Sequence, residues 1–146
     1  MSNLAIVGSR NFSNLALVKR IVKALKPETV VVSGGARGVD ATAESEAQRF
    51  ISFRPYEMDS IYGYKLYSIE THSDFDIELT QRINPPCFKT WAQAAFARNR
   101  WIIDISQGCI AFWDGHSKGT AHSIAIAQSK GIWLRVYAPD ATFVQK

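Results

Sequence analysis

The chain has 146 residues, of which 47% are hydrophobic, and its 17 lysines and arginines outnumber its 13 aspartates and glutamates to give a net charge of +4. This length suits one domain, and the balance of apolar and charged residues excludes extensive disorder. No apolar stretch reaches the length that crosses a bilayer, and residues 1–3 open without the features of a signal peptide. We therefore expect a soluble cytoplasmic protein that makes no membrane contact.

The first half of the chain alternates short apolar runs with amphipathic patterns. Residues 4–7 form a continuous apolar run, typical of a buried parallel strand, and residues 15–25 follow with helical spacing. Residues 29–32 predict a second strand, and a second helix begins at about Val39. These elements are typical of repeated strand–helix units.

Residues 51–58 predict a third strand, and its proline places it at a sheet edge, because Pro55 cannot donate a ladder hydrogen bond. From residue 59 to residue 89 no clear period remains. We predict that this stretch is an irregular insertion or lid, since regular elements resume after it.

The remainder returns to the alternating pattern. We expect a helix over about 90–106, a fourth strand over 110–113, a helix over 120–130 and a fifth strand over 132–137. The tail, residues 138–146, is expected to be loosely held.

Together these elements predict an α/β fold: a three-layer, Rossmann-like, doubly wound parallel sheet of about five strands in the order 3-2-1-4-5, with the insertion after strand 3. We expect a single domain over residues 1–146. Ligands of such sheets bind at the switch point, here between strands 1 and 4. Three loops meet there, formed by residues 8–10, 34–38 and 114–120.

The loop after the second strand has the composition of a phosphate-binding turn. Gly34, Gly35 and Gly38 permit positive φ and let backbone N–H groups approach a phosphate at a helix start. Arg37 adds positive charge, and Asp40 either caps the helix or meets a ribose hydroxyl. The alternative is a tight strand–helix turn with a solvated arginine.

The loop after the fourth strand repeats this composition. A hydroxyl, an ammonium and backbone donors at a helix start suit a phosphate, and they come from Ser117, Lys118, Gly119 and Thr120. His116 either touches a phosphate or base or is a solvated turn residue. The first loop adds Gly8, Ser9 and Arg10 at the same edge.

Arg98 interrupts the apolar stripe of the 90–106 helix. That stripe consists of Trp91, Ala94, Ala95, Trp101, Ile102 and Ile105. A guanidinium that faces a core is costly unless an anion or several acceptors meet it. Arg98 therefore either faces a ligand or pairs with a carboxylate such as Asp40 or Glu44, while Asn99 lies at the shoulder of the stripe.

Metal binding and disulfides find little support. Cys87 and Cys109 are too few for a disulfide scaffold and lack metal-ligand spacing. His72, Asp74 and Asp76 resemble a ligand set only superficially, because they lie in an irregular polar stretch. We predict no metal site and no cofactor.

The segments 8–10, 33–40, 97–99 and 117–120 resemble the SLOG superfamily, which unites the Smf/DNA-processing proteins with the LOG (Lonely Guy) enzymes, and in particular its YspA-like branch of small stand-alone proteins. The resemblance covers about three-quarters of the chain. It implies a Rossmann-like fold that binds nucleotides or nucleotide-derived ligands through these loops.

LOG enzymes hydrolyse the N-glycosidic bond of nucleoside monophosphates, and the match to their site is incomplete. Arg98 matches their arginine, and the pair Gly119 and Thr120 matches their Gly-Thr, but Ser123 stands at the position of their glutamate. Their assisting carboxylate is thus missing, and Asp40, Glu44 or Asp114 would have to replace it. The catalytic candidates are Arg98, Asp40 and Asp114.

Three functions follow as hypotheses. The first is binding of a small nucleotide-type ligand, a nucleoside phosphate or an ADP-ribose-like molecule, through the glycine-rich loops. The second is a nucleotide N-glycosidase or phosphoribohydrolase of LOG type. The third is binding of single-stranded DNA, which is not favoured because the loops carry few basic residues. A homodimer is a further prediction, since four tryptophans leave apolar surface to cover.

Overall fold

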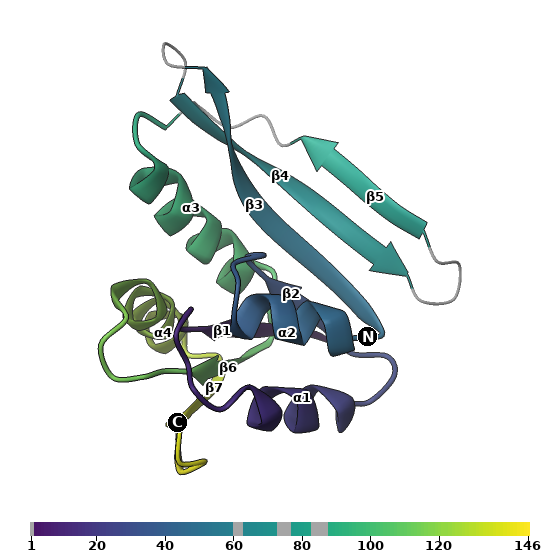
Figure 1. Ribbon diagram of the computed structural model, residues 1–146, viewed down its shortest axis with the longest axis vertical. Helices are drawn as coiled ribbons and strands as arrows, with labels where there is room; N and C mark the ends of the chain where they lie inside the picture. Colours follow the sequence, from purple (N-terminus) through teal and green to yellow (C-terminus); the bar gives the residue numbers. More distant parts are fainter. Residues whose placement is uncertain (1, 60–62, 73–76, 83–87) are drawn as a thin grey trace.

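The computed structural model describes residues 2–59, 63–72, 77–82 and 88–146 (Figure 1). Along this part of the chain strands and helices alternate, except that strands follow one another between α2 and α3 and again after α4. The helices are α1 (Leu15–Lys23), α2 (Val39–Glu46), α3 (Trp91–Asp104) and α4 (Lys118–Lys130). The strands are β1 (Asn3–Gly8), β2 (Val30–Ser33), β3 (Arg49–Asp59), β4 (Gly63–His72), β5 (Ile77–Arg82), β6 (Gly108–Phe112), β7 (Trp133–Tyr137) and β8 (Phe143–Gln145).

In these residues all eight strands form one sheet, in the order β5-β4-β3-β2-β1-β6-β7-β8. The inner strands β3, β2, β1, β6 and β7 pair in parallel, which confirms the order predicted for the five strands read from the sequence. The outer pairs are antiparallel. The fold is α/β and Rossmann-like, and the expectation of a wholly parallel sheet is wrong.

Helices cover both faces of the sheet, as Figure 1 shows. Successive side chains of β1 point to opposite faces, so Ala5 and Val7 pack in the cluster with α3 and α4, whereas Ile6 packs with α1 and α2. This arrangement confirms the three predicted layers. The expectation of a single domain stays a prediction.

Side-chain caps fix the starts of the two helices that border the candidate site. At α3 the Thr90 hydroxyl accepts a hydrogen bond from Gln93 N (3.2 Å), and the Gln93 side chain accepts one from Thr90 N (3.4 Å). At α4 the Ser117 hydroxyl accepts from Thr120 N (3.5 Å). No helix in the described part of the chain is long and apolar enough to cross a membrane.

Residues 59–89, expected to be irregular, contain the two strands β4 and β5. Both extend the sheet beyond β3. The sequence did not predict β4 as a strand, because β4 buries side chains on both of its faces. Its neighbouring residues Ser68 and Ile69 are both buried, so apolar and polar residues do not alternate along it. The proposed lid falls partly on residues 60–62, 73–76 and 83–87, which lie outside the described residues.

The edge position predicted from Pro55 is wrong, since β3 lies between β2 and β4. The register explains why the proline is tolerated. The pairing of β3 with β2 ends at Ser52, and Pro55 lies beyond it, opposite Leu66 of β4. The missing N–H of Pro55 therefore costs no hydrogen bond to β2.

The tail is better held than expected. Residues 143–145 form β8, which pairs antiparallel with β7. A turn precedes the strand, in which the Asp140 carboxylate accepts hydrogen bonds from the Thr142 hydroxyl (2.6 Å) and backbone N–H (3.0 Å). The sequence did not predict this hairpin, because β8 has only three residues and polar turn residues precede it. The side chains of β8 remain exposed.

Candidate functional site

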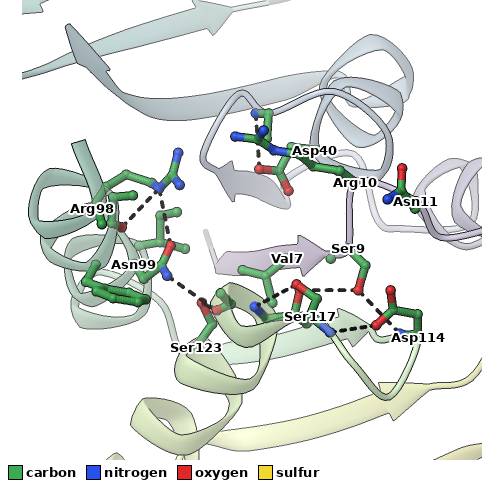
Figure 2. Close-up of a pocket in the computed structure, with 18 of the residues that line it drawn as sticks. Val7, Ser9, Arg10, Asn11, Asp40, Arg98, Asn99, Asp114, Ser117 and Ser123 are labelled. Carbon is green, nitrogen blue, oxygen red and sulfur yellow. Dashed lines mark hydrogen bonds between the residues drawn. The ribbon is translucent and has the colours of Figure 1, made fainter. Parts of the chain in front are cut away.

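A cavity of about 520 Å³ opens at the carboxyl end of the parallel strands. It is lined by the end of β1 and the loop after it, by Ala36 and Asp40 beside the start of α2, by the loop after β6 with the start of α4, and by one side of α3. Figure 2 shows Arg98 and Asn99 projecting from α3 on one side and Ser9, Asp114 and Ser117 on the other. The cavity thus lies at the switch point between β1 and β6.

The predicted loops 8–10 and 114–120 meet at this cavity through hydroxyl groups. Ser9 is buried, and its hydroxyl lies 3.5 Å from the Thr120 hydroxyl, which lies 3.2 Å from that of Ser117. These contacts hold the start of α4 against the end of β1. Of the residues predicted in these two loops, the cavity is lined by Gly8, Ser9, Arg10, Asp114, His116, Ser117, Gly119 and Thr120.

Asp114, a catalytic candidate, shapes the loop after β6. One carboxylate oxygen accepts hydrogen bonds from His116 N and Ser117 N, both at 2.8 Å, and Asp114 N donates to the Ser9 hydroxyl (3.3 Å). The two backbone donors hold the pKa of Asp114 below its ordinary value. The carboxylate therefore has a structural task at the cavity wall, and its catalytic role stays a prediction.

Arg98 lies in the cavity wall and is only 9% exposed. Its Nη1 donates to the Gly34 carbonyl (2.8 Å), and its Nε donates to the Asn99 side-chain oxygen (3.2 Å). The Asn99 amide in turn donates to the Gly119 carbonyl (3.4 Å). Asn99 thus connects the guanidinium to the start of α4 and fixes its orientation.

Asp40 is the buried carboxyl group that interacts electrostatically with Arg98. It is 7% exposed, and one of its oxygens accepts a hydrogen bond from Ala36 N (3.2 Å). Burial raises the pKa of Asp40 to about 7, although the Arg98 charge and the Ala36 N–H oppose the shift. Burial also lowers the pKa of Arg98, which Asp40 raises and Arg10 lowers further. Two guanidiniums and one readily protonated carboxyl group therefore share the cavity.

The glycine loop after β2, residues 34–38, packs closely against the Arg98 side chain. A Cβ atom on Gly34 would stand 2.8 Å from Cδ and Nη1 of Arg98, so no side chain fits there. Gly35, at φ 69°, packs in the same way against Arg54, whose guanidinium pairs with Glu44 (3.1 Å). The loop is clamped between two arginines. The alternative of an Arg98–Glu44 pair is wrong, because Glu44 forms its ion pair with Arg54.

Parts of the two predicted phosphate loops do not reach the cavity. The predicted residues that do not line it are Gly34, Gly35, Arg37, Gly38 and Lys118. Arg37 and Lys118 are exposed at the surface. The glycines serve close backbone packing instead, which the sequence alone does not distinguish from phosphate binding.

Two aromatic residues that the sequence did not predict as site residues border the cavity. Trp91 and Phe96 are 42% and 41% exposed, so the placement of Trp91 on the buried stripe of its helix is wrong. The Arg10 guanidinium lies 5.3 Å from the centre of the Trp91 ring, and the Phe96 and His122 rings are 4.5 Å apart. The apolar Phe96, off the core stripe, was the available signal.

Ser123 and Asn11 also line the cavity. The Ser123 hydroxyl donates to the Gly119 carbonyl (3.3 Å), a bond within α4. The position that carries a glutamate in LOG enzymes thus offers a short hydroxyl group already engaged with the backbone. Nothing about Asn11 in the sequence marked it before the loop geometry was known.

No metal site is found in the parts of the chain that the structure describes. The run from His72 to Asp76 includes residues 73–76, which lie outside the described residues. Cys109 is fully buried, and burial raises the pKa of its thiol to about 12, so it is an unreactive core residue.

Comparison with known proteins decides the family. Residues 1–145 match the family described as DNA recombination-mediator protein A. The chain belongs to this family. The DNA-processing side of the SLOG resemblance is confirmed, and a place in the YspA-like branch stays a prediction. No curated protein matches the chain.

Two solved structures of DNA-processing protein A resemble this member of the family. The protein from Streptococcus pneumoniae is 22% identical with a TM-score of 0.66, covering 94% of this chain and 50% of its own. The protein from Helicobacter pylori, described as having a unique mode of single-stranded DNA binding, is 24% identical with a TM-score of 0.62, covering 93% and 65%. These likenesses establish the fold, and the chain spans half to about two-thirds of each relative.

Proposed function

We propose that the chain binds single-stranded DNA and that one nucleotide of the strand occupies the cavity of about 520 Å³. The observation that carries the proposal is the buried guanidinium of Arg98 in the cavity wall, because a buried cation is stabilised by an anion that meets it. Membership of the DNA recombination-mediator family and the described DNA binding of the Helicobacter pylori relative support the choice of ligand.

The cavity combines the two kinds of contact that a single strand needs. Arg98 and Arg10 supply charge, and the start of α4 supplies backbone N–H groups with the hydroxyls of Ser117 and Thr120, which together suit a phosphate. At the rim Trp91 presents an exposed ring on which an unpaired base would stack. A duplex holds its bases stacked inside, so it would not use this ring.

Fluorescence anisotropy with a labelled oligothymidylate tests the proposal. Arg10→Ala and Arg98→Ala should each weaken binding by at least about tenfold, since a charge-assisted hydrogen bond is worth about 1.5–3 kcal/mol. Arg20→Ala, an exposed arginine on α1, is the matched control and should not change the affinity. Circular dichroism checks that the variants fold. Unchanged binding by both folded cavity variants, or equal affinity for a duplex, contradicts the proposal.

A compact nucleotide-type ligand is the second candidate, and the size of the cavity favours it, since about 300–1,000 Å³ is typical of small-molecule sites. A YspA-like placement would fit this function. Thermal shift with nucleoside phosphates, ADP-ribose and NAD separates the two candidates: stabilisation by a free nucleotide, with no affinity for the oligonucleotide, selects the small ligand.

Two further predictions, hydrolysis of an N-glycosidic bond and a homodimer, are each tested by a separate assay. Hydrolysis of an N-glycosidic bond would use Asp40, the buried carboxyl group whose pKa of about 7 suits proton transfer, and release of free base from a nucleoside monophosphate is the measurement. A homodimer is tested by sedimentation equilibrium.

A further inference from the structure

The distal half of the β3–β4 hairpin extends beyond the parallel core, as Figure 1 shows. Its two faces differ. Phe53 points toward α3, where its ring lies 5.9 Å from the ring of Trp101. Because side chains alternate along a strand, Arg54 and Tyr56 point to the opposite face.

That opposite face carries cations and aromatic rings side by side. Arg54 lies opposite Tyr67 of β4, and Tyr56 lies opposite Lys65. The Tyr56 and Tyr67 rings meet edge to face at 5.7 Å, and all four side chains are partly exposed. We call these four residues the hairpin face. Alternating basic and aromatic side chains are the composition of surfaces that bind single-stranded nucleic acid.

The glycine loop connects the hairpin face to the cavity. On the cavity side Arg98 packs against Gly34, and on the hairpin side Arg54 packs against Gly35. Arg37 projects from the same loop into solvent. Basic side chains thus follow one another from the cavity wall across one short loop to β3.

Within the hairpin face the residues have different tasks. Arg54, with a side chain 33% exposed, is paired with the buried Glu44, so it mainly fixes the glycine loop. Lys65 adds positive charge that attracts phosphates, as Arg37 does in the neighbouring glycine loop. Tyr56 and Tyr67 offer rings to bases, and Tyr56 lies about 7 Å farther along β3 than Arg54.

We propose that a DNA single strand leaving the cavity crosses the 34–38 loop and continues along the hairpin face. This inference rests on the proposed function and deepens it: the site would take several consecutive nucleotides, with one in the cavity and the next ones against the tyrosines. A short oligonucleotide would fill only the cavity, whereas a long one would reach both.

The test compares oligothymidylates of about 2 and about 20 nucleotides, since single-strand sites take roughly 4–16 nucleotides and the shorter strand cannot reach beyond the cavity. Tyr56→Ala should weaken binding of the long strand about tenfold and leave binding of the short strand unchanged. Lys65→Ala should also reduce the salt dependence of long-strand binding by about 0.7 in log Kd per log salt. Tyr56→Phe and Lys65→Arg should keep wild-type binding, and Lys19→Ala on α1 is the matched charge control.

The outcomes separate this inference from the proposed function. If Arg10→Ala weakens both strands and the hairpin variants weaken only the long one, both are supported. If the folded hairpin variants bind the long strand like the wild type, or no more weakly than Lys19→Ala does, the inference is wrong while the cavity site stands. If neither strand binds the wild type, the proposed function itself fails.

Discussion

Replacing Asp40 by asparagine should change how the stability of the protein depends on pH. In the folded chain the pKa of Asp40 is raised by burial from 3.8 to about 7. Between these two values the folded state binds more protons than the unfolded state, so stability falls as pH rises. With 1.36 kcal/mol for each pKa unit, the loss is on the order of 4 kcal/mol, and most of it occurs between about pH 4 and about pH 7.

Asp40→Asn removes this titration and keeps an acceptor for Ala36 N. The free energy of unfolding of the wild type, relative to the variant, should fall by on the order of 4 kcal/mol from about pH 4 to about pH 9 and then level off. Urea denaturation of both proteins across this range measures the difference. Glu28→Gln, at an exposed position before β2, is the control for the loss of one acidic side chain.

The same titration bears on the proposed ligand. Below pH 7 Asp40 is neutral and the guanidiniums of Arg98 and Arg10 dominate the cavity, whereas above pH 7 its carboxylate opposes an incoming phosphate. DNA affinity of the wild type should therefore fall through pH 7 more steeply than that of Asp40→Asn. Parallel stability curves for the wild type and Asp40→Asn would refute the assignment of a raised pKa to this buried carboxyl group.

Three smaller changes test other contacts. Thr90→Ala removes half of the capping box of α3 and should lower the free energy of unfolding by about 1 kcal/mol in urea denaturation, and a loss within error would contradict the role of the cap. Gly119→Ala should raise stability by about 0.5 kcal/mol, because a Cβ there meets no atom within 4 Å and alanine favours helix. It should also weaken DNA binding by filling space beside the start of α4, and unchanged anisotropy would exclude a close backbone approach. Arg54→Ala should cost about 2 kcal/mol by leaving Glu44 buried without its cation, and adding Glu44→Gln should restore part of that loss in a double-mutant cycle.

The sequence predicts the parallel core well because its strands are short apolar runs that end at glycine or serine, such as residues 4–7 and 29–32. It misses the outer strands for a different reason. Half-buried antiparallel strands need polar and apolar residues to alternate, and β4 breaks the rule with Ser68 buried on the face toward α3 and Ile69 on the other. The edge position read from Pro55 failed because strands of unequal length share only part of their register.

For the site, the best signal was a charge in an apolar stripe. Arg98 is buried at the cavity wall as that pattern predicted, and the loops at Ser9 and Thr120 come together beside it. For the glycine loop, in contrast, the sequence pattern did not predict which group the glycines accommodate. Gly34 makes room for a side chain of the protein itself, and a sequence cannot tell such packing from room for a phosphate.

Because β2 is shorter than β3, the sheet has an inner part and an outer part that differ in local stability. As far as Ser52, β3 is held by the parallel core, but from Phe53 onward it is held by β4 and by its contact with α3. Amide protons on either side of this boundary should therefore exchange with deuterium at different rates, the outer ones through opening events that leave the inner sheet closed. Since α3 also carries Arg98, such an opening would loosen one wall of the cavity without unfolding the chain.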